Sequence, residues 1–291
     1  MRKKKLDNQK KIIIIGSLCL LLCLCVGYAA FQTTISLKAK GNVKEKPAAE
    51  KLKELVVTTG DGLYEDAYEE GRYFYKGSNP NNYITFNNET WRIISVESDG
   101  TIKILRNESI GNQVWSSTSS NAWDKPANIK TYLNETYLPT ITTNQDKIAA
   151  HTWSIGAVEE ANSNLTEQIT SENGTQSQSS TIGLITVSEY LRVNTNTEQC
   201  GNLNLNNTNK ETCKTTNWIQ TIVPSNGYLW TISPDTVIFD GVFSVSGTLD
   251  MTGNVFADMA DGSNGVAPVL YLSADIKLSG EGTELSPYVI E

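Results

Sequence analysis

The sequence contains a single histidine, His151, and this scarcity limits the catalytic mechanisms that the chain can support. A Ser-His-Asp triad or a Cys-His pair would have to use this one imidazole. His151 lies in the segment KIAAHTWSIG, and no Gly-x-Ser-x-Gly motif accompanies it in the sequence. We therefore expect His151 to be a packed or hydrogen-bonded structural residue. The sequence predicts no catalytic residue, and it favours a non-enzymatic protein without excluding an enzyme.

Cysteines are few, and their positions exclude several kinds of site. Cys19, Cys23 and Cys25 lie in an apolar run, and each follows a leucine, where a lipoprotein would have a small residue. No Cys-x-x-Cys pair is present, so a zinc site is not expected. The remaining pair, Cys200 and Cys213, is typical of a disulfide in an oxidising compartment. Its closure would stabilise the fold by about 3 kcal/mol. Two free thiols are the alternative.

Basic side chains are scarce once the first eleven residues are set aside. Those residues, MRKKKLDNQKK, hold six of the 24 basic side chains and one of the 32 acidic ones. The rest of the chain therefore has 18 basic and 31 acidic side chains, a net charge of −13. Nucleic acids and anionic lipids favour positively charged partners, so neither is expected to bind. No phosphate-binding glycine loop ending in Lys-Ser or Lys-Thr is present either.

An uncharged apolar segment does follow the basic tail. Residues 12–30, IIIIGSLCLLLCLCVGYAA, would form a helix of about 28 Å, close to the hydrocarbon thickness of a bilayer. The basic residues 1–11 favour the cytoplasmic side of a membrane. We expect a single-pass protein of the cell membrane, with residues 1–11 in the cytoplasm and the C-terminal part outside. Gly27-Tyr28-Ala29 also fits a signal-peptidase site, so cleavage after Ala29 and secretion is the alternative.

The part after the membrane segment divides into a connecting region, residues 31–59, and an extracellular domain, residues 60–291. Residues 31–43 alternate apolar and polar side chains with a strand-like period. The charged residues 44–59 predict a stalk with a short helix over 48–55. Roughly 230 residues remain, enough for one domain with a sizeable core.

Strand patterns at both ends of this domain enclose a central part with helical patterns. The expected strands are 83–86, 90–96, 101–105, 228–232, 237–239, 242–245, 255–257 and 266–272. Asp99-Gly100 predicts a hairpin turn, and helices are expected over 123–138 and 187–193, the second capped by Thr186. The polar residues 161–180 predict a solvated insertion loop. This order predicts an α+β domain whose first and last strands share one sheet.

Seven stretches of the domain, taken in order, resemble a family of surface modules from Gram-positive gut bacteria that has no established activity. They are ITFNNETWRIISVESDGTIKILRNESI (84–110), NAWDKPANIKTYLN (121–134), IAAHTWSIGAV (148–158), IGLITVSEYL (182–191), YLWTISP (228–234), GVAPVLYL (265–272) and GEGTELSPYVI (280–290). More remotely, the domain resembles the C-type-lectin-like fold of the formylglycine-generating-enzyme type. The resemblance implies a mixed domain with a small antiparallel sheet, two short helices and long loops.

Two departures limit what the resemblance implies about activity. Ala267 stands where the family pattern GVRP has arginine, so no role is carried over to this position. An oxidase of the formylglycine-generating type would need copper-binding cysteines in the C-terminal part, and Cys200 and Cys213 precede that region. The stretch GYAAFQTTISLKAKGNV (27–43) separately resembles the start of secreted fibre and biofilm-matrix subunits.

Two groups of residues are candidates for ligand contact. Asp258, Asp261 and Asn264 surround a glycine turn in ADMADGSNG (257–265), and their oxygens suit calcium. The same residue types also form turns that bind no ion, and no other cofactor is expected. Trp115 and Trp218 lie in polar stretches, so we expect exposed indoles that stack on sugar rings, with core packing as the alternative.

Three functions follow as hypotheses. The first is a membrane-anchored extracellular surface protein whose non-catalytic binding or adhesion domain takes a glycan, a wall polymer or a surface protein. The second is a structural subunit or decoration of an extracellular fibre or matrix. The third is a carbohydrate-active hydrolase that uses paired carboxylates.

Overall fold

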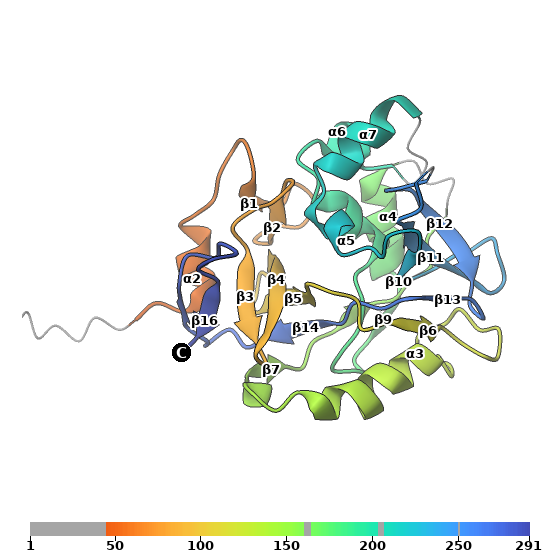
Figure 1. The fold of residues 1–291 in the computed structure, drawn as a ribbon, viewed down its shortest axis with the longest axis horizontal. Helices are drawn as coiled ribbons and strands as arrows, with labels where there is room; N and C mark the ends of the chain where they lie inside the picture. Colours follow the sequence, from red (N-terminus) through yellow and green to blue (C-terminus); the bar gives the residue numbers. More distant parts are fainter. Residues whose placement is uncertain (1–44, 160–163, 203–206, 250) are drawn as a thin grey trace, which may run out of the picture. The chain divides into compact units, whose positions relative to one another are not determined.

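The computed structural model describes most of the chain after the connecting region (Figure 1). The described residues are 45–159, 164–202, 207–249 and 251–291. The basic tail, the predicted membrane segment 12–30 and the strand-like residues 31–43 lie outside them. Within the described part of the chain, no helix is long and apolar enough to cross a bilayer.

The largest element is a curled sheet of nine strands, which forms one half of the described unit (Figure 1). Its main path runs β15 (Leu278–Ser279), β16 (Tyr288–Ile290), β3 (Tyr83–Phe86), β4 (Glu89–Val96), β5 (Ile102–Arg106), β14 (Val269–Leu272) and β7 (Ile148–Ala149). Strands β1 (Gly62–Glu65) and β2 (Tyr73–Lys76) extend it where β2 pairs with the end of β4. Asn87 and Asn88, both with positive φ, turn β3 into β4, and Gly100, at φ 86°, lies in the next turn.

Strands from the end of the chain complete this sheet. Leu270 of β14 pairs with Ile104 of β5, and Tyr288 of β16 pairs in parallel with Ile84 of β3. The prediction that the first and last segments share a sheet is therefore confirmed.

A second sheet of five strands forms the other half of the unit. Its order is β12 (Val255–Met259), β11 (Gly241–Ser246), β10 (Tyr228–Pro234), β13 (Ser263–Gly265) and β6 (Asn112–Val114). A two-stranded ladder joins β8 (Trp153–Ser154) to β9 (Gln176–Ser177). Side chains from both sheets belong to one continuous apolar core.

The helices of the described residues are short. They are α2 (Ala48–Lys53), α3 (Asn128–Thr131), η1 (Tyr132–Tyr137), η2 (Leu138–Thr140), η3 (Gln145–Lys147), α4 (Leu165–Asn173), α5 (Val187–Arg192), α6 (Thr197–Cys200), α7 (Asn207–Thr215) and η4 (Trp218–Thr221). Thr186 caps helix α5, as predicted. The cap is a full capping box, because the hydroxyl of Thr186 accepts from the Glu189 amide and the Glu189 carboxylate accepts from the Thr186 amide. The molecule is thus a mixed α+β fold with short helices and long loops.

The disulfide predicted between Cys200 and Cys213 is present. It joins α6 to α7 across a sequence separation of 13. Both cysteines are buried, so the bridge packs into the fold as well as closing the loop.

Three expectations about the elements are wrong or shifted. The expected insertion loop contains α4, because the Asn164 side chain caps it and Leu165 and Ile169 are buried one turn apart. The helix expected over 123–138 begins only at Asn128. The expected strand 237–239 is an exposed turn, since the Asp235 carboxylate accepts from the Val237 amide.

The folded unit also begins earlier than the expected boundary near residue 60. The described compact unit starts at Glu45. Ala48, Ala49 and Leu52 of α2 are buried in the core, so residues 45–59 are part of the domain and not a stalk. The charged face of α2 concealed this in the sequence, because Lys51 and Lys53 alternate with the buried positions.

Candidate functional site

The two tryptophans expected at the surface are buried. Trp115 is 0% exposed and packs between Trp123 and Trp230, at ring-centroid distances of 5.6 and 5.9 Å. Trp218 is also 0% exposed, and its Nε1 donates to the Tyr75 carbonyl at 2.9 Å. The expectation of exposed indoles is wrong because the fold covers both rings. Trp115 packs against two other indoles, and the Arg92 guanidinium lies 4.8 Å from the centroid of the Trp218 ring.

The predicted calcium residues lie close together, but two of them bind each other. The Asp258 Oδ2 atom accepts from the Asn264 side-chain amide at 2.8 Å, and its Oδ1 accepts from the Met259 amide at 2.8 Å. Asp261 is exposed on the following turn. No group of three or more His, Cys, Asp or Glu side chains in the described residues is arranged to hold a metal. Calcium binding here stays a prediction.

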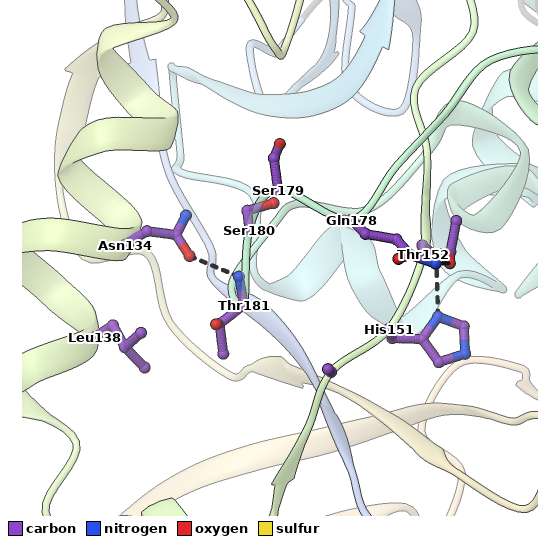
Figure 2. Close-up of a pocket in the computed structure, with 9 residues that line it drawn as sticks. Asn134, Leu138, His151, Thr152, Gln178, Ser179, Ser180 and Thr181 are labelled. Carbon is purple, nitrogen blue, oxygen red and sulfur yellow. Dashed lines mark hydrogen bonds between the residues drawn. The ribbon is translucent and has the colours of Figure 1, made fainter.

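A hollow of about 410 Å³ opens between η1 and the segments that contain His151 and Ser180 (Figure 2). We call it the hydroxyl hollow, and its lining residues are Asn134, Leu138, Ala150, His151, Thr152, Gln178, Ser179, Ser180 and Thr181. Six of these nine carry a hydroxyl or an amide side chain, and none carries a carboxylate, an ammonium or a guanidinium group. Its volume is within the range of small-molecule sites.

The polar wall of this hollow is held in place by the core beneath it. Trp123 Nε1 donates to the Ser180 hydroxyl at 3.1 Å, and Trp153 Nε1 donates to the Ser180 carbonyl at 2.9 Å. The Asn134 side chain accepts from the amides of Thr181 and Ile182 at 2.8 and 2.9 Å. These bonds fix the backbone of residues 180–182 in the wall of the hollow.

His151 forms the boundary between this hollow and a second one. Its ring stacks on Tyr271 with centroids 3.7 Å apart and an interplanar angle of 8°. The Nδ1 atom lies 2.9 Å from the Thr152 carbonyl oxygen, which only accepts, so the proton resides on Nδ1. The Nε2 atom is 3.8 Å from an Asp99 carboxylate oxygen, and the side chain is 22% exposed. His151 is therefore a stacked and hydrogen-bonded residue whose ring remains partly accessible.

The second hollow, of about 220 Å³, is lined by charged side chains that pair with one another. What we call the ion network consists of Glu69, Arg72, Glu97, Lys103, Glu189 and Arg192 of this lining, together with Asp66, which pairs with Arg192 outside it. Arg72 contacts three carboxylates at once, at 2.6 to 2.9 Å. Lys103 Nζ lies 2.6 Å from Glu189, and both side chains are only 3% exposed.

The cations of the network lower the pKa values of two of its carboxyl groups. Burial by itself would raise the pKa of Glu189, but the charges of Lys103 and Arg72 lower it to about 2. Glu69 behaves in the same way beside Arg72 and Arg192, with a pKa of about 2.

Glu172 lines the same hollow but has no cation against it. Burial raises its pKa above 4.5, although its carboxylate accepts hydrogen bonds from Ser188 and Ser233. The hollow thus combines carboxyl groups whose pKa is lowered by neighbouring cations with one, Glu172, whose pKa is raised by burial.

Sequence patterns alone did not reveal the ion network. Glu189 was identifiable only as part of a helix start, three residues after Thr186. Lys103 lies between Ile102 and Ile104 in β5, and a lysine at such a position normally faces solvent. Its burial results from contacts with α5, which is 86 residues away along the chain.

No protein-family model, curated protein or solved structure matches this chain.

Proposed function

We propose that this protein is a membrane-anchored extracellular binding protein that takes a neutral glycan in the hydroxyl hollow. The observation that carries the proposal is the lining itself, in which hydroxyl and amide side chains predominate and formal charges are missing. Sugar hydroxyl groups are both donors and acceptors, and such side chains match them in both roles. Leu138 and the carbons of His151 supply apolar contact for the faces of a sugar ring.

The sequence supports the location that this function requires. The charge step between residues 11 and 12 supports an anchor with an external domain. A disulfide agrees with an oxidising compartment. A curled sheet with long loops, closed by a late strand, is also compatible with a C-type-lectin-like domain, which we propose as the finer description of the fold.

A glycan array probed with the full chain in detergent micelles tests the proposal. We expect binding to uncharged oligosaccharides, with loss of affinity in Thr181→Val. That substitution removes one hydroxyl from the hollow and leaves the backbone bond from the Thr181 amide to Asn134 intact. One lost hydrogen bond of about 1 kcal/mol corresponds to a roughly fivefold weaker Kd.

Thr142→Val is the matched control, because Thr142 is exposed and lies outside the hollow. Its affinity should equal that of the parent protein. Folded protein that binds no uncharged glycan on the array would refute the proposal.

A second candidate function is hydrolysis of a glycan that extends past His151 into the second hollow, and the carboxyl groups of that hollow favour it. Glycosidases pair a protonated acid with an ionised carboxylate, and the two groups of such a pair have different pKa values. Burial raises the pKa of Glu172, whereas the pKa of Glu189 is about 2. Release of reducing ends by the parent protein, abolished in Glu172→Gln with binding retained, would establish this function. Binding without any turnover would exclude it.

A further inference from the structure

A group of exposed apolar side chains lies at one end of the five-stranded sheet. Four large apolar side chains are exposed there: Phe239 at 88%, Val237 at 71%, Met259 at 55% and Ile238 at 41%. Val237, Ile238 and Phe239 are consecutive and lie in the turn between β10 and β11, whereas Met259 is the last residue of β12. Met259 pairs with Gly241, and the Ala260 amide donates to the Asp240 carbonyl at 2.9 Å, so the strand end lies beside the turn. We call these four residues the apolar tip.

The apolar tip is a firmly held turn. Asp235 accepts from the Val237 amide at 2.8 Å through its side chain, and its own amide donates to the Gly241 carbonyl at 2.8 Å. The Gly241 amide donates to the Ile238 carbonyl at 2.9 Å. The Asn121 side chain donates to the Asp235 and Gly241 carbonyls at 3.0 and 3.2 Å. These bonds hold the backbone at both ends of the turn, and the turn presents the apolar side chains outward.

The small area of the apolar tip favours contact with the interior of a lipid bilayer over contact with a protein partner. A stable protein interface buries about 800 Å² on each side, which requires some 20 residues or more. Four side chains on one turn are too few for that. A bilayer interior needs no matching shape, and each large apolar side chain that enters it gains about 1.5 to 3 kcal/mol. A tethered domain needs only such a weak affinity, because the tether raises the effective concentration.

The length of chain before the described unit allows this contact. Residues 31–44 connect the proposed anchor to Glu45, and fourteen extended residues reach at most about 46 to 50 Å. A domain of this size is about 45 Å across. The tip and the start of α2 lie at opposite ends of the longest axis of the described unit (Figure 1). The length of residues 31–44 is therefore compatible with contact between the tip and the membrane.

The charges around the tip select the type of lipid. Asp240, Asp258 and Asp261 belong to the segments next to the four apolar residues. Anionic headgroups would be repelled by these carboxylates, whereas zwitterionic or uncharged headgroups would not.

We propose that the apolar tip inserts into the outer leaflet of the same membrane that anchors the chain, at zwitterionic or uncharged lipids. The inference rests on the anchor in the proposed function and is independent of the glycan site. Insertion fixes the domain on its side, with two points of attachment instead of one.

Quenching of tryptophan fluorescence by brominated phosphatidylcholine tests the insertion in the full chain reconstituted into vesicles. The six native tryptophans are at most 1% exposed, so an added indole at the surface gives a distinct signal. In Phe239→Trp, we expect most of the added emission to be lost when the acyl chains carry bromine. Leu285→Trp is the matched control, because Leu285 is 99% exposed in the turn between β15 and β16, on the α2 side of the unit. Its emission should be unchanged.

A second reporter separates insertion from mere proximity to the membrane. Val237→Trp should be quenched as well, and adding Phe239→Asp to it should abolish the quenching. Protein that floats with the vesicles but shows no quenching at position 239 would overturn the proposal, and equal quenching at position 285 would do the same. Protein that fails to float with the vesicles would refute the anchor, and with it this inference, whatever the glycan array shows.

Discussion

At the scale of single residues, Glu189 combines two roles that are usually separate. Its carboxylate closes the capping box of α5 and also contacts Lys103 and Arg72. A buried ion pair contributes little compared with an apolar pair, but removing one partner leaves a charge without compensation. The ion network is therefore a place where single substitutions have large effects.

Lys103→Met tests this sensitivity. The substitution keeps the length of the side chain and removes the ammonium group that lies 2.6 Å from Glu189. We expect a loss of about 3 kcal/mol in the free energy of unfolding, measured by chemical denaturation of the full chain. Lys147→Met is the control, because Lys147 pairs with Asp146 at the surface and should change stability by less than about 1 kcal/mol. Equal effects of the two substitutions would contradict the prediction.

The pH dependence of stability has a defined direction. The pKa of Glu189 falls from 4.5 to about 2 on folding. As the pH is lowered, this carboxylate therefore takes up a proton in the unfolded chain before it does so in the folded chain. The stability that this group contributes is complete above pH 4.5 and is lost as the pH falls from 4.5 towards 2. Denaturation midpoints measured across this range should fall steeply in the parent protein. The fall should be shallower in Glu189→Gln, and identical slopes would refute the assignment.

At the scale of elements, local sequence patterns predicted the strands and helices whose formation depends on residues close together in the sequence. Strand β3 was expected at the same residues, and β4, β5 and α5 were expected to within one residue at each end, because alternation, an Asp-Gly turn and the Thr186 cap act over a few positions. Segment 237–239 looked like a strand from its composition, yet it forms a turn because of the side chain of Asp235. The hydroxyl hollow could not be predicted, since it requires Asn134, His151 and Ser180 to meet through tertiary packing.

The α6–α7 pair depends on its disulfide. The bridge closes a loop with a sequence separation of 13, for which the chain-entropy model gives about 3 kcal/mol. The double variant Cys200→Ser/Cys213→Ser should lose about this much stability in thermal or chemical unfolding. Dithiothreitol should lower the stability of the parent protein to the same level and have no effect on the double variant. An effect of reductant on the double variant would show that the measured loss has another origin.

At the scale of the whole molecule, the excess of acidic side chains separates the possible partners. Beyond residue 11 the chain has a net charge of −13, so a basic partner would bind more weakly as salt screens the attraction. A neutral glycan should bind with the same Kd from about 0.05 to about 0.5 M salt. Calorimetric titration at these salt concentrations is the measurement. A Kd that weakens severalfold with salt would indicate a charged ligand in place of a neutral one.

The pairing of β16 with β3 also determines when the nine-stranded sheet can be completed during synthesis and folding. Residues 288–290 are hydrogen-bonded neighbours of residues 83–86, so the central sheet lacks its last strands until almost the entire chain has been synthesised. If the C-terminal part is exported, β3 has to wait outside the membrane as an unpaired edge while some 200 further residues follow. Folding then comes after translocation, and the period before closure is the one in which extracellular proteases and neighbouring chains have access to the unfinished sheet.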